Sequence, residues 1–453
     1  GYLSADGAAA PGYSGGGSGG TIALSAATLA GAGAVISANG GSGNAGVCGG
    51  PTCYDGSGGG GRIAITYTTD NYNSGVPAQL TSTKFRALGS YIGDSRAGAA
   101  GTIYLNHIGD STCAPNGDLN SDGNCEKLYI NNASNPHTQT VETPLTGSDY
   151  YDQIISENQG TYLVNSGDAY VMPTQTLDYR LSVVGTLTVP GRNLTINNGG
   201  WLDWRIVTDV ALTSVTINSG GVATHSQNYS TQAYQLVFDV TDFTLNGGSI
   251  NVDGKGYGGL NTSNGSGGNT SSTTVAFGGS HGGVGGGGLA TYDDYYSPAV
   301  IGSGGGPNSS GPYSYGGGYV KIAATGTVTL NGTISANGDN GSSSTPGGGA
   351  GGAVDITTDT IAGSSAVVRA NGANGSGGSN VGGGGGRVAM KYNHDNFDSP
   401  GIVSANLSAH GGSSTAAAGT IFLRNLLTQT YGTLIVKNAG NSYGESQITT
   451  LPN

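Results

Sequence analysis

The residues with the clearest chemical potential form a short polar segment, 118–126, with oxygen-bearing side chains at alternate positions. Calcium needs several hard oxygen ligands from one tight turn, and Gly123 would permit the sharp bend that brings them together. The spacing therefore predicts a Ca²⁺ site, with a metal-free turn as the alternative. Its side-chain ligands would be Asp118, Asn120 and Asp122, joined by the backbone carbonyl of Asn124 and a direct or water-mediated contact from Glu126.

These nine residues resemble the D-x-[DN]-x-[DN]-G calcium loop of EF-hands, dockerins and thrombospondin type-3 repeats. At the twelfth position, where an EF-hand carries a bidentate Glu, this chain has Tyr129. No helical pattern flanks the loop. The resemblance thus implies calcium binding in a loop that is not an EF-hand.

Four cysteines form two pairs that are close in sequence, Cys48 with Cys53 and Cys113 with Cys125. A disulfide within each pair is the simplest of the three possible pairings. Such bonds persist in an oxidising, extracellular setting. A zinc site is the rival, but no His or second CxxC-type pair lies near either pair in sequence. Comparison of the two ends of the chain places each pair in a loop insertion on a repeated scaffold.

Asn-x-Ser/Thr triplets are candidate glycosylation sites in a secreted chain. Chance also produces such triplets in sequence this rich in Gly, Ser, Asn and Thr. Among the eleven present are those at Asn132, Asn193, Asn228, Asn264, Asn308, Asn331 and Asn406.

Signatures of catalysis are missing from the sequence. It contains no G-x-S-x-G or H-E-x-x-H motif, and its Gly-rich runs are not followed by the Gly-Lys-Ser/Thr of a phosphate-binding loop. We therefore predict that the protein is not an enzyme. A carbohydrate-active enzyme is the rival class, and it would need acids and a basic residue on one face. A passive glycan- or ice-binding module with flat Thr ladders is a third hypothesis.

The elements that must position these residues repeat along the chain. Gly318–Gly338, Gly352–Gly372 and Gly20–Gly40 each begin with Gly and reach an Ala-Asn-Gly stop, whose Ala lies 18 residues after the opening Gly. A fixed spacing in non-identical sequence indicates one reused supersecondary unit. Alternating apolar and polar residues within it predict short strands with one buried face. We interpret the unit as one coil of a parallel β-helix, with helix limited to at most a short cap.

A longer repeat joins the two ends of the chain. The segment 61–67 matches 386–392, 100–105 matches 418–423, and 128–130 matches 434–436. We therefore predict three segments: 1–147 with the loop insertions, 148–331 in the centre, and 332–453 as a second copy of the first. The chain also starts partway through a unit, which indicates a piece of a longer protein.

Composition narrows the class of partner. Gly contributes 89 of 453 residues, only 9% of residues are charged, and the net charge is −12. An acidic chain is a poor partner for nucleic acid or anionic membrane, and no run of 18 apolar residues predicts a membrane span. The Gly tracts between strands are either flexible excursions or extended segments packed against the scaffold, and their recurrence at fixed places favours packing.

Together, the Ala-Asn-Gly stops, Gly-rich tracts and Gly-Arg-Ile/Val-Ala restarts resemble the glycine-rich repeats of very large microbial surface and fibre proteins. The resemblance implies a right-handed parallel β-helix, secretion, and adhesion or fibre building. We therefore expect an all-β solenoid with Gly-rich loop excursions, located outside the cell or on its surface. It would be a segment or subunit of a repetitive filament, sheath or adhesin, stiffened by disulfides and Ca²⁺. Its partner would be itself, head to tail, with glycans as further partners, and the alternative is a polysaccharide-binding or polysaccharide-degrading β-helix protein.

Overall fold

The computed structural model describes most of the chain. Its described residues are 1–11, 14–31, 34–43, 56–71, 85–90, 98–111, 122–131, 143–145, 151, 153–157, 161–164, 169–171, 176–177, 180–183, 186–205, 212–259, 277–287, 290–306, 314–340, 347–375, 381–398, 400–402, 406–413 and 415–438. They contain strands, turns and one 3₁₀ turn at Pro190–Arg192, and they form no α-helix. The predicted all-β class is thus confirmed. Nothing in this described part of the chain is a helix able to cross a membrane.

The chain divides into two compact units, Gly1–Gly191 and Arg192–Asn453, so the boundary falls inside the predicted central segment. The first unit holds fourteen strands. They are β1 (Tyr2–Ser4), β2 (Thr21–Ala30), β3 (Val35–Ser37), β4 (Arg62–Asn71), β5 (Phe85–Arg86), β6 (Thr102–Ile108), β7 (Asn124–Asn131), β8 (Thr143–Leu145), β9 (Gln153–Glu157), β10 (Thr161–Val164), β11 (Ala169–Val171), β12 (Thr176–Leu177), β13 (Arg180–Val183) and β14 (Thr186–Thr188).

Strand pairing in the first unit is mostly parallel. One sheet has the order β1-β3-β5 and another the order β2-β4-β6-β7-β9. In the second of these, only the β6–β7 pair is antiparallel. β10 pairs in parallel with both β8 and β13, and β11 pairs in parallel with β14.

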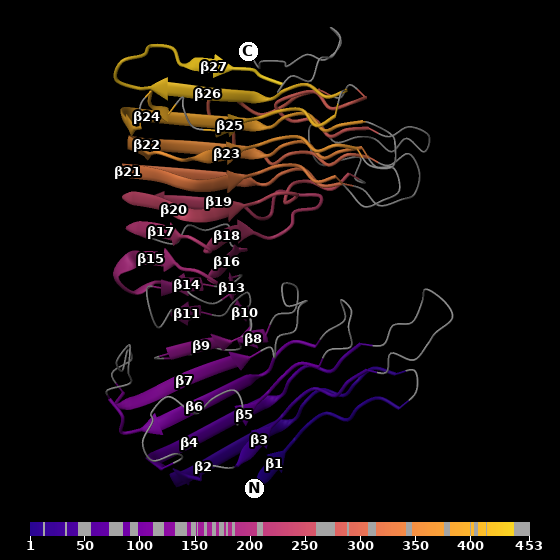
Figure 1. The fold of residues 1–453 in the computed structure, drawn as a ribbon, viewed down its shortest axis with the longest axis vertical. Helices are drawn as coiled ribbons and strands as arrows, with labels where there is room; N and C mark the ends of the chain where they lie inside the picture. Colours follow the sequence, from indigo (N-terminus) through magenta and orange to yellow (C-terminus); the bar gives the residue numbers. More distant parts are fainter. Residues whose placement is uncertain are drawn as a thin grey trace. The chain divides into compact units, whose positions relative to one another are not determined.

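The second unit holds the remaining strands, which Figure 1 shows in successive rows. They are β15 (Asn193–Ile196), β16 (Trp201–Trp204), β17 (Ser214–Asn218), β18 (Val222–His225), β19 (Leu236–Val240), β20 (Asp242–Asn251), β21 (Tyr319–Ser335), β22 (Ala353–Gly363), β23 (Val367–Arg369), β24 (Arg387–Phe397), β25 (Asn406–Ser408), β26 (Thr420–Asn425) and β27 (Thr433–Ile435).

Three parallel ladders run through the second unit. The first joins β19, β21, β22, β24 and β26 through their N-terminal parts. The second joins β15, β17 and β20 to the middle of β21 and the ends of β22 and β24. The third joins β16, β18, the end of β20, the end of β21, β23 and β25. β21 therefore passes through all three ladders in turn.

The register of these ladders follows the sequence repeat. Tyr319 pairs with Ala353 and Thr333 pairs with Val367, in each case 34 residues apart. The two repeat units Gly318–Gly338 and Gly352–Gly372 thus lie side by side with matched residues opposite one another at both ends, while a register shift after Ala324 brings Thr327 opposite Thr360. A one-residue slip would turn every buried side chain outward, which makes this register well determined.

The long repeat is also visible as a pair of equivalent hairpins. Tyr104 of β6 pairs with Leu128 of β7, and Phe422 of β26 pairs with Leu434 of β27, both in antiparallel fashion. These are the residues that the sequence comparison matched. The two ends of the chain therefore fold locally into the same hairpin.

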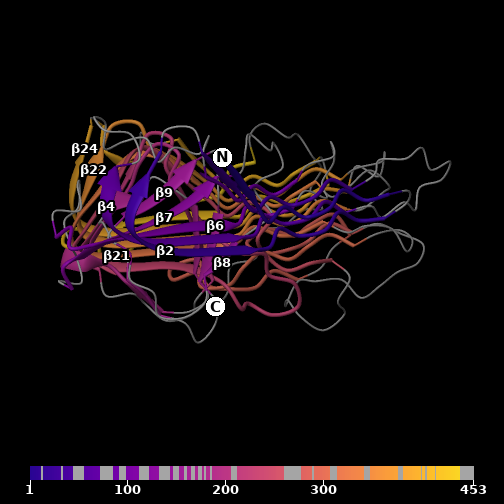
Figure 2. The ribbon, with the colours of Figure 1, turned by 90° about the horizontal axis from the view of Figure 1, so that it is seen from below.

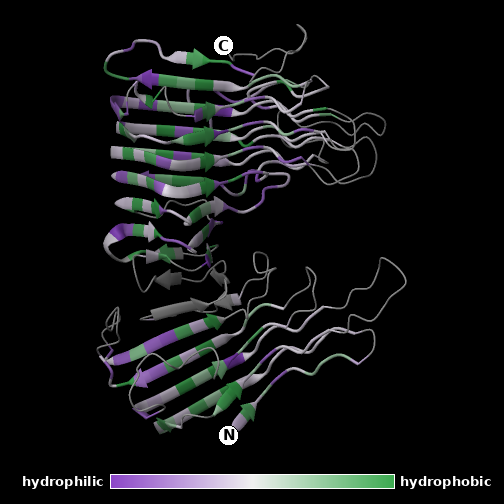
Figure 3. Ribbon diagram, in the orientation of Figure 1, coloured by the Kyte–Doolittle hydropathy of each residue, from purple (hydrophilic) through white to green (hydrophobic). Residues whose placement is uncertain are grey.

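Aliphatic side chains that alternate along the strands form the core, as the alternation of hydrophobic and hydrophilic residues in Figure 3 shows. Val320, Ile322, Val328, Leu330 and Ile334 of β21 are all fully buried. Each such side chain contributes about 1.5–3 kcal/mol relative to an exposed position. One long strand thus supplies core residues to all three ladders.

Beyond the strands, the Gly-rich tracts lie side by side, as Figures 1 and 2 show. Their described parts are ordered by backbone hydrogen bonds between tracts. Gly41 N donates to Gly17 O at 2.8 Å, and Gly58 N donates to Gly41 O at 2.9 Å. In the second unit, Gly351 N donates to Gly384 O at 2.9 Å. The described tracts therefore pack as predicted, rather than forming loose excursions.

Replacement of Gly58 by Ala tests this packing. A Cβ at Gly58 would overlap the carbonyl oxygen of Gly17, whereas a Cβ at the adjacent Gly59 would lie 3.6 Å from Ala99 O. We expect Gly58→Ala to lower the free energy of unfolding by about 1–3 kcal/mol, the usual cost of overpacking. Gly59→Ala is the matched control, and we expect it to change stability by less than about 0.5 kcal/mol. Thermal unfolding measures both, and equal stability of the two variants would contradict the packing argument.

Candidate functional site

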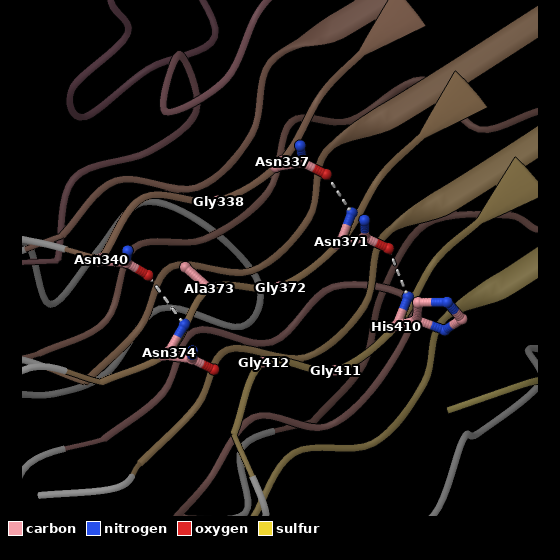
Figure 4. Close-up of a pocket in the computed structure, with 10 residues that line it drawn as sticks. All are labelled: Asn337, Gly338, Asn340, Asn371, Gly372, Ala373, Asn374, His410, Gly411 and Gly412. Carbon is pink, nitrogen blue, oxygen red and sulfur yellow. Dashed lines mark hydrogen bonds between the residues drawn. The ribbon is translucent and has the colours of Figure 1, made fainter. Parts of the chain in front are cut away.

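The Ala-Asn-Gly corners form a ladder of their own in the second unit. Asn337, Asn371 and His410 each follow a strand of the third ladder by two residues. Asn337 Oδ1 accepts a hydrogen bond from Asn371 N at 2.8 Å, and Asn371 Oδ1 accepts one from His410 N at 2.8 Å (Figure 4). Each side chain thus caps the backbone N–H of the next row, where the chain leaves the strand and its N–H needs an acceptor.

Each described corner ladder begins with an Asp instead of an Asn. Asp253 Oδ1 accepts from Asn337 N and from the Ser335 hydroxyl, both at 2.6 Å. In the first unit, Asp6 Oδ1 accepts from Asn39 N at 2.6 Å. Burial alone would raise the pKa of Asp6, but hydrogen bonds from the Asn39 backbone and neighbouring hydroxyls hold that pKa below its usual range. A carboxylate has the acceptor capacity to serve two or more donors at the first rung.

A groove of about 410 Å³ lies along these corners in the second unit. Asn340 Oδ1 accepts a hydrogen bond from Asn374 N at 3.0 Å. These two residues form a second row of stacked Asn residues beside the first (Figure 4). The groove is lined by amides, glycines and one imidazole: Asn337, Gly338, Asn340, Asn371, Gly372, Ala373, Asn374, His410, Gly411 and Gly412. Such a lining offers hydrogen bonds to a polar ligand, but no carboxylate or nucleophile for catalysis.

A second polar cluster lies beneath the segment 291–301, which we call the strap. The strap covers one face of β24 and β26. It is the face opposite the one from which the aliphatic side chains of these strands project. Arg387 is fully buried there, and its Nε and Nη2 donate to Tyr292 O at 3.1 and 2.8 Å. Its Nη1 donates to the Thr420 hydroxyl at 3.1 Å. Tyr295 and Tyr296 pack on the Phe422 ring. The strap thus buries a face of the sheet that alternation alone would leave to solvent.

Lys391 and Asp355 form a buried ion pair under the same strap. Lys391 Nζ lies 2.8 Å from Asp355 Oδ1, and the two side chains are only 6% and 11% exposed. Nζ also donates to Tyr296 O at 2.9 Å and lies 4.9 Å from the centre of the Tyr296 ring. Burial raises the pKa of Asp355, and the neighbouring Lys391 offsets this only in part.

His281 and Asp293 complete the cluster. His281 Nε2 lies 3.1 Å from Asp293 Oδ2, and Nδ1 lies 2.8 Å from Gly351 O. Both ring nitrogens face acceptors, which is the arrangement a protonated imidazole satisfies. Burial would raise the pKa of Asp293, but bonds from His281 and from the backbone N–H of Ala299 outweigh it and hold the pKa below its usual range.

Sequence reasoning did not find this cluster. No motif or repeat marks it, because Arg387 lies 95 residues beyond Tyr292, the strap residue to which it donates. The repeat register did carry a signal for the ion pair. Asp355 pairs with Ala389, so Lys391 stands two residues along the neighbouring strand and on the same face.

The predicted calcium loop is described only in part, because Asp118 and Asn120 lie outside the described residues. Gly123 has φ +84° and makes the expected bend. Asp122 Oδ1 accepts from Asn124 N at 2.8 Å. Glu126 is buried on β7. The described residues hold no group of three or more His, Cys, Asp or Glu side chains suited to a metal. Calcium binding stays a prediction.

The cysteine pairing also stays a prediction. Cys125 is buried on β7, and it is not a free cysteine. Its predicted partner Cys113 and the pair Cys48 and Cys53 lie outside the described residues.

The candidate glycosylation sites differ in access. Asn193 and Asn406 are exposed, and Asn331 is half-buried. Asn228 is buried, and its Nδ2 donates to Tyr234 O and Lys255 O, both at 2.9 Å. The Asn228 side chain is therefore inaccessible in the folded chain. The others, Asn132, Asn264 and Asn308, lie outside the described residues.

Comparisons with known proteins supply no relative: no family model, no curated protein and no solved structure matches this chain.

Replacement of Asn371 tests the corner ladder. Asn371→Ala removes the acceptor of the His410 N–H, so we expect the free energy of unfolding to fall by about 1–2 kcal/mol. Asn371→Asp keeps an acceptor, as Asp253 does two rows earlier, and we expect a smaller loss. Thermal unfolding and hydrogen exchange at the His410 amide measure the effect. Unchanged exchange in Asn371→Ala would refute the capping role.

Removal of calcium tests the loop. If Ca²⁺ binds the folded chain alone, saturation at a hundredfold excess over Kd stabilises it by about 2.7 kcal/mol. We expect a chelator to lower the Tm of the wild type but not of the double variant Asp118→Ala/Asp122→Ala. Asp359→Ala, which removes a half-buried carboxylate elsewhere in the chain, should respond to the chelator as the wild type does. A chelator effect that survives in the double variant would place the calcium site elsewhere.

Proposed function

We propose that this chain is a structural segment or subunit of a repetitive extracellular filament, sheath or surface adhesin. Its scaffold would be a right-handed parallel β-helix that grows by adding coils. The three parallel ladders of the second unit support this architecture, since β21 enters them one after another as a coil would. Stacking of identical coils suits a long protein in which each repeat contacts only its neighbours.

The observation that carries the proposal is the position of the exposed apolar side chains. Among the described residues, most of the large exposed ones belong to two places. Tyr2 and Leu3 lie on β1, an edge strand of its sheet. Four more lie on or beside the β26–β27 hairpin: Leu426, Leu427, Tyr431 and Val436. Exposed apolar groups at strand edges are a template for association with another chain.

The equivalent hairpin in the first unit, β6–β7, indicates that such an edge can pair with a further strand. There, β9 pairs with the free side of β7, and Leu128 and Ile130 are buried. The matching residues of the second copy are Leu434, which is half-buried, and Val436, which is 50% exposed. Among the described residues, a further strand thus covers the first copy of this hairpin and none covers the second. In this proposal, a second copy of the chain covers it.

An extracellular location is part of this proposal. It rests on the two close cysteine pairs, on the sequons and on the acidic composition. Disulfides and Ca²⁺ would stiffen the loops that carry them. Neither nucleic acid nor a membrane interior is a partner in this account.

A polysaccharide-binding role is the second candidate, and the amide-lined groove favours it. Asn340 and Asn374 present side-chain amides in stacked rows there, and amides hydrogen-bond to hydroxyl groups. Degradation of a polysaccharide is less well supported. Two acids with basic neighbours, Asp293 and Asp355, are buried, and the exposed pair of Asp239 and Lys321 is not among the residues that line the groove. We assign no catalytic residue.

Electron microscopy and sedimentation over a concentration series test the assembly. We expect end-to-end rows that lengthen with concentration. The double variant Leu427→Glu/Val436→Asp should raise the concentration needed at least tenfold, because each buried apolar side chain is worth about 1.5–3 kcal/mol. Both residues are exposed, so the fold should tolerate the change.

Tyr229→Ser is the matched control, since Tyr229 is 60% exposed but lies at neither edge. We expect it to assemble like the wild type. Strictly monomeric particles at every concentration would contradict head-to-tail assembly, and monomers that bind insoluble polysaccharide would favour the second candidate.

A further inference from the structure

We propose that Lys391 and Asp355 join through a spontaneous isopeptide bond that covalently links β24 to β22. Nζ and Oδ1 lie 2.8 Å apart. Asp355 Oδ1 is buried without another hydrogen-bond partner among the described residues. The amine is thus held against the carboxyl group within reach of the reacting carbon. The bond forms within one chain, so the proposal does not depend on assembly.

The surroundings of Asp355 favour its protonated, neutral form. A buried ion pair loses the hydration of both charges, which costs several kcal/mol per ion. Tyr296 and the strap cover Lys391 on one side, and Tyr319, which is 5% exposed, lies close to Asp355. The charge of Asp293 raises the pKa of Asp355 and so favours its protonated form, whereas the charge of Lys321 lowers that pKa. Burial is the larger influence, and it too favours the protonated acid.

The reaction is a condensation that needs no oxidant or other reactant. One proton moves from the Lys391 ammonium to the Asp355 carboxylate, which gives an amine and a carboxylic acid. Nζ then attacks Cγ, a C–N bond forms, and a second proton passes from nitrogen to the departing hydroxyl group. The C–O bond breaks and water leaves. The Ser297 hydroxyl lies 3.2 Å from Nζ, close enough to relay that second proton.

Position and burial together drive the reaction toward the amide. Two groups held at contact distance in a folded chain can have an effective concentration of about 10⁵–10⁸ M. Formation of a neutral amide also removes two buried charges. Because β22 and β24 are neighbours in the first ladder, the bond would lock two successive rows of the scaffold against separation under load.

A matched control exists within the same chain. Lys321 on β21 and Asp239 on β19 also form an ion pair across neighbouring parallel strands, with Nζ 3.3 Å from Oδ1. Their side chains are 38% and 42% exposed. Water stabilises both charges there, so this pair should stay an ion pair. The comparison separates the effect of burial from that of residue type.

Mass spectrometry of the full chain, reduced and alkylated, tests the proposal. We expect an intact mass lower than that of the sequence by one water molecule. Trypsin does not cleave after an acylated lysine, so residues 322–369 should be recovered joined to 388–424. No such link should join Asp239 to Lys321. The variants Asp355→Ala and Lys391→Met should each have the full mass.

Two results would overturn the inference. One is recovery of 388–391 and 322–369 as separate, unmodified peptides from the folded wild type, which would leave Lys391 and Asp355 as an ion pair only. The other is equal cross-linking of the exposed pair, which would remove burial as the cause. Both are read from wild-type protein, so they hold even if a variant fails to fold.

Discussion

Close approach of backbone to backbone at glycine is the constraint on which this structure depends. In the described tracts, a Cβ at Gly316, Gly349 or Gly383 would overlap a carbonyl oxygen of a neighbouring tract. The backbone N–H and C=O groups of neighbouring tracts can therefore hydrogen-bond to one another, as they do in a sheet, although the tracts are not strands. In these described tracts, glycine is thus a packing requirement.

This packing explains how the strands and the polar corners fit together. The rows of β21 and β23 leave their strands at an Ala-Asn-Gly corner, enter a glycine tract and return to the next strand. The corner side chain, as in Asn337 and Asn371, caps the backbone of the next row at the point of exit. Core strands, corner ladder and glycine tracts thus share one row-to-row spacing, and a shift in any of them would disturb the other two.

The strap adds features that the repeat does not contain. It covers a face that carries Arg387 and Lys391 and turns it from a surface into an interior. Buried charges need partners, and each finds one in the strap backbone or in a neighbouring acid. The first copy has Arg62 where the second has Arg387, and Arg62 is exposed. Equivalent residues thus take opposite environments, and Arg387 owes its burial to contacts that include the strap backbone.

The sequence by itself determined the all-β class and the equivalence of the matched segments at the two ends, because strand alternation and repeat spacing are local, periodic signals. It did not indicate that these segments pair as antiparallel hairpins. It also marked the corner residues, although not their capping role, and it predicted the bend at Gly123. Only the tertiary structure decided that His281 meets Asp293 and that Lys391 meets Asp355 in a water-poor site. The physical reason is that burial of these charges depends on the path of the strap, a segment without periodicity, across rows far away in sequence.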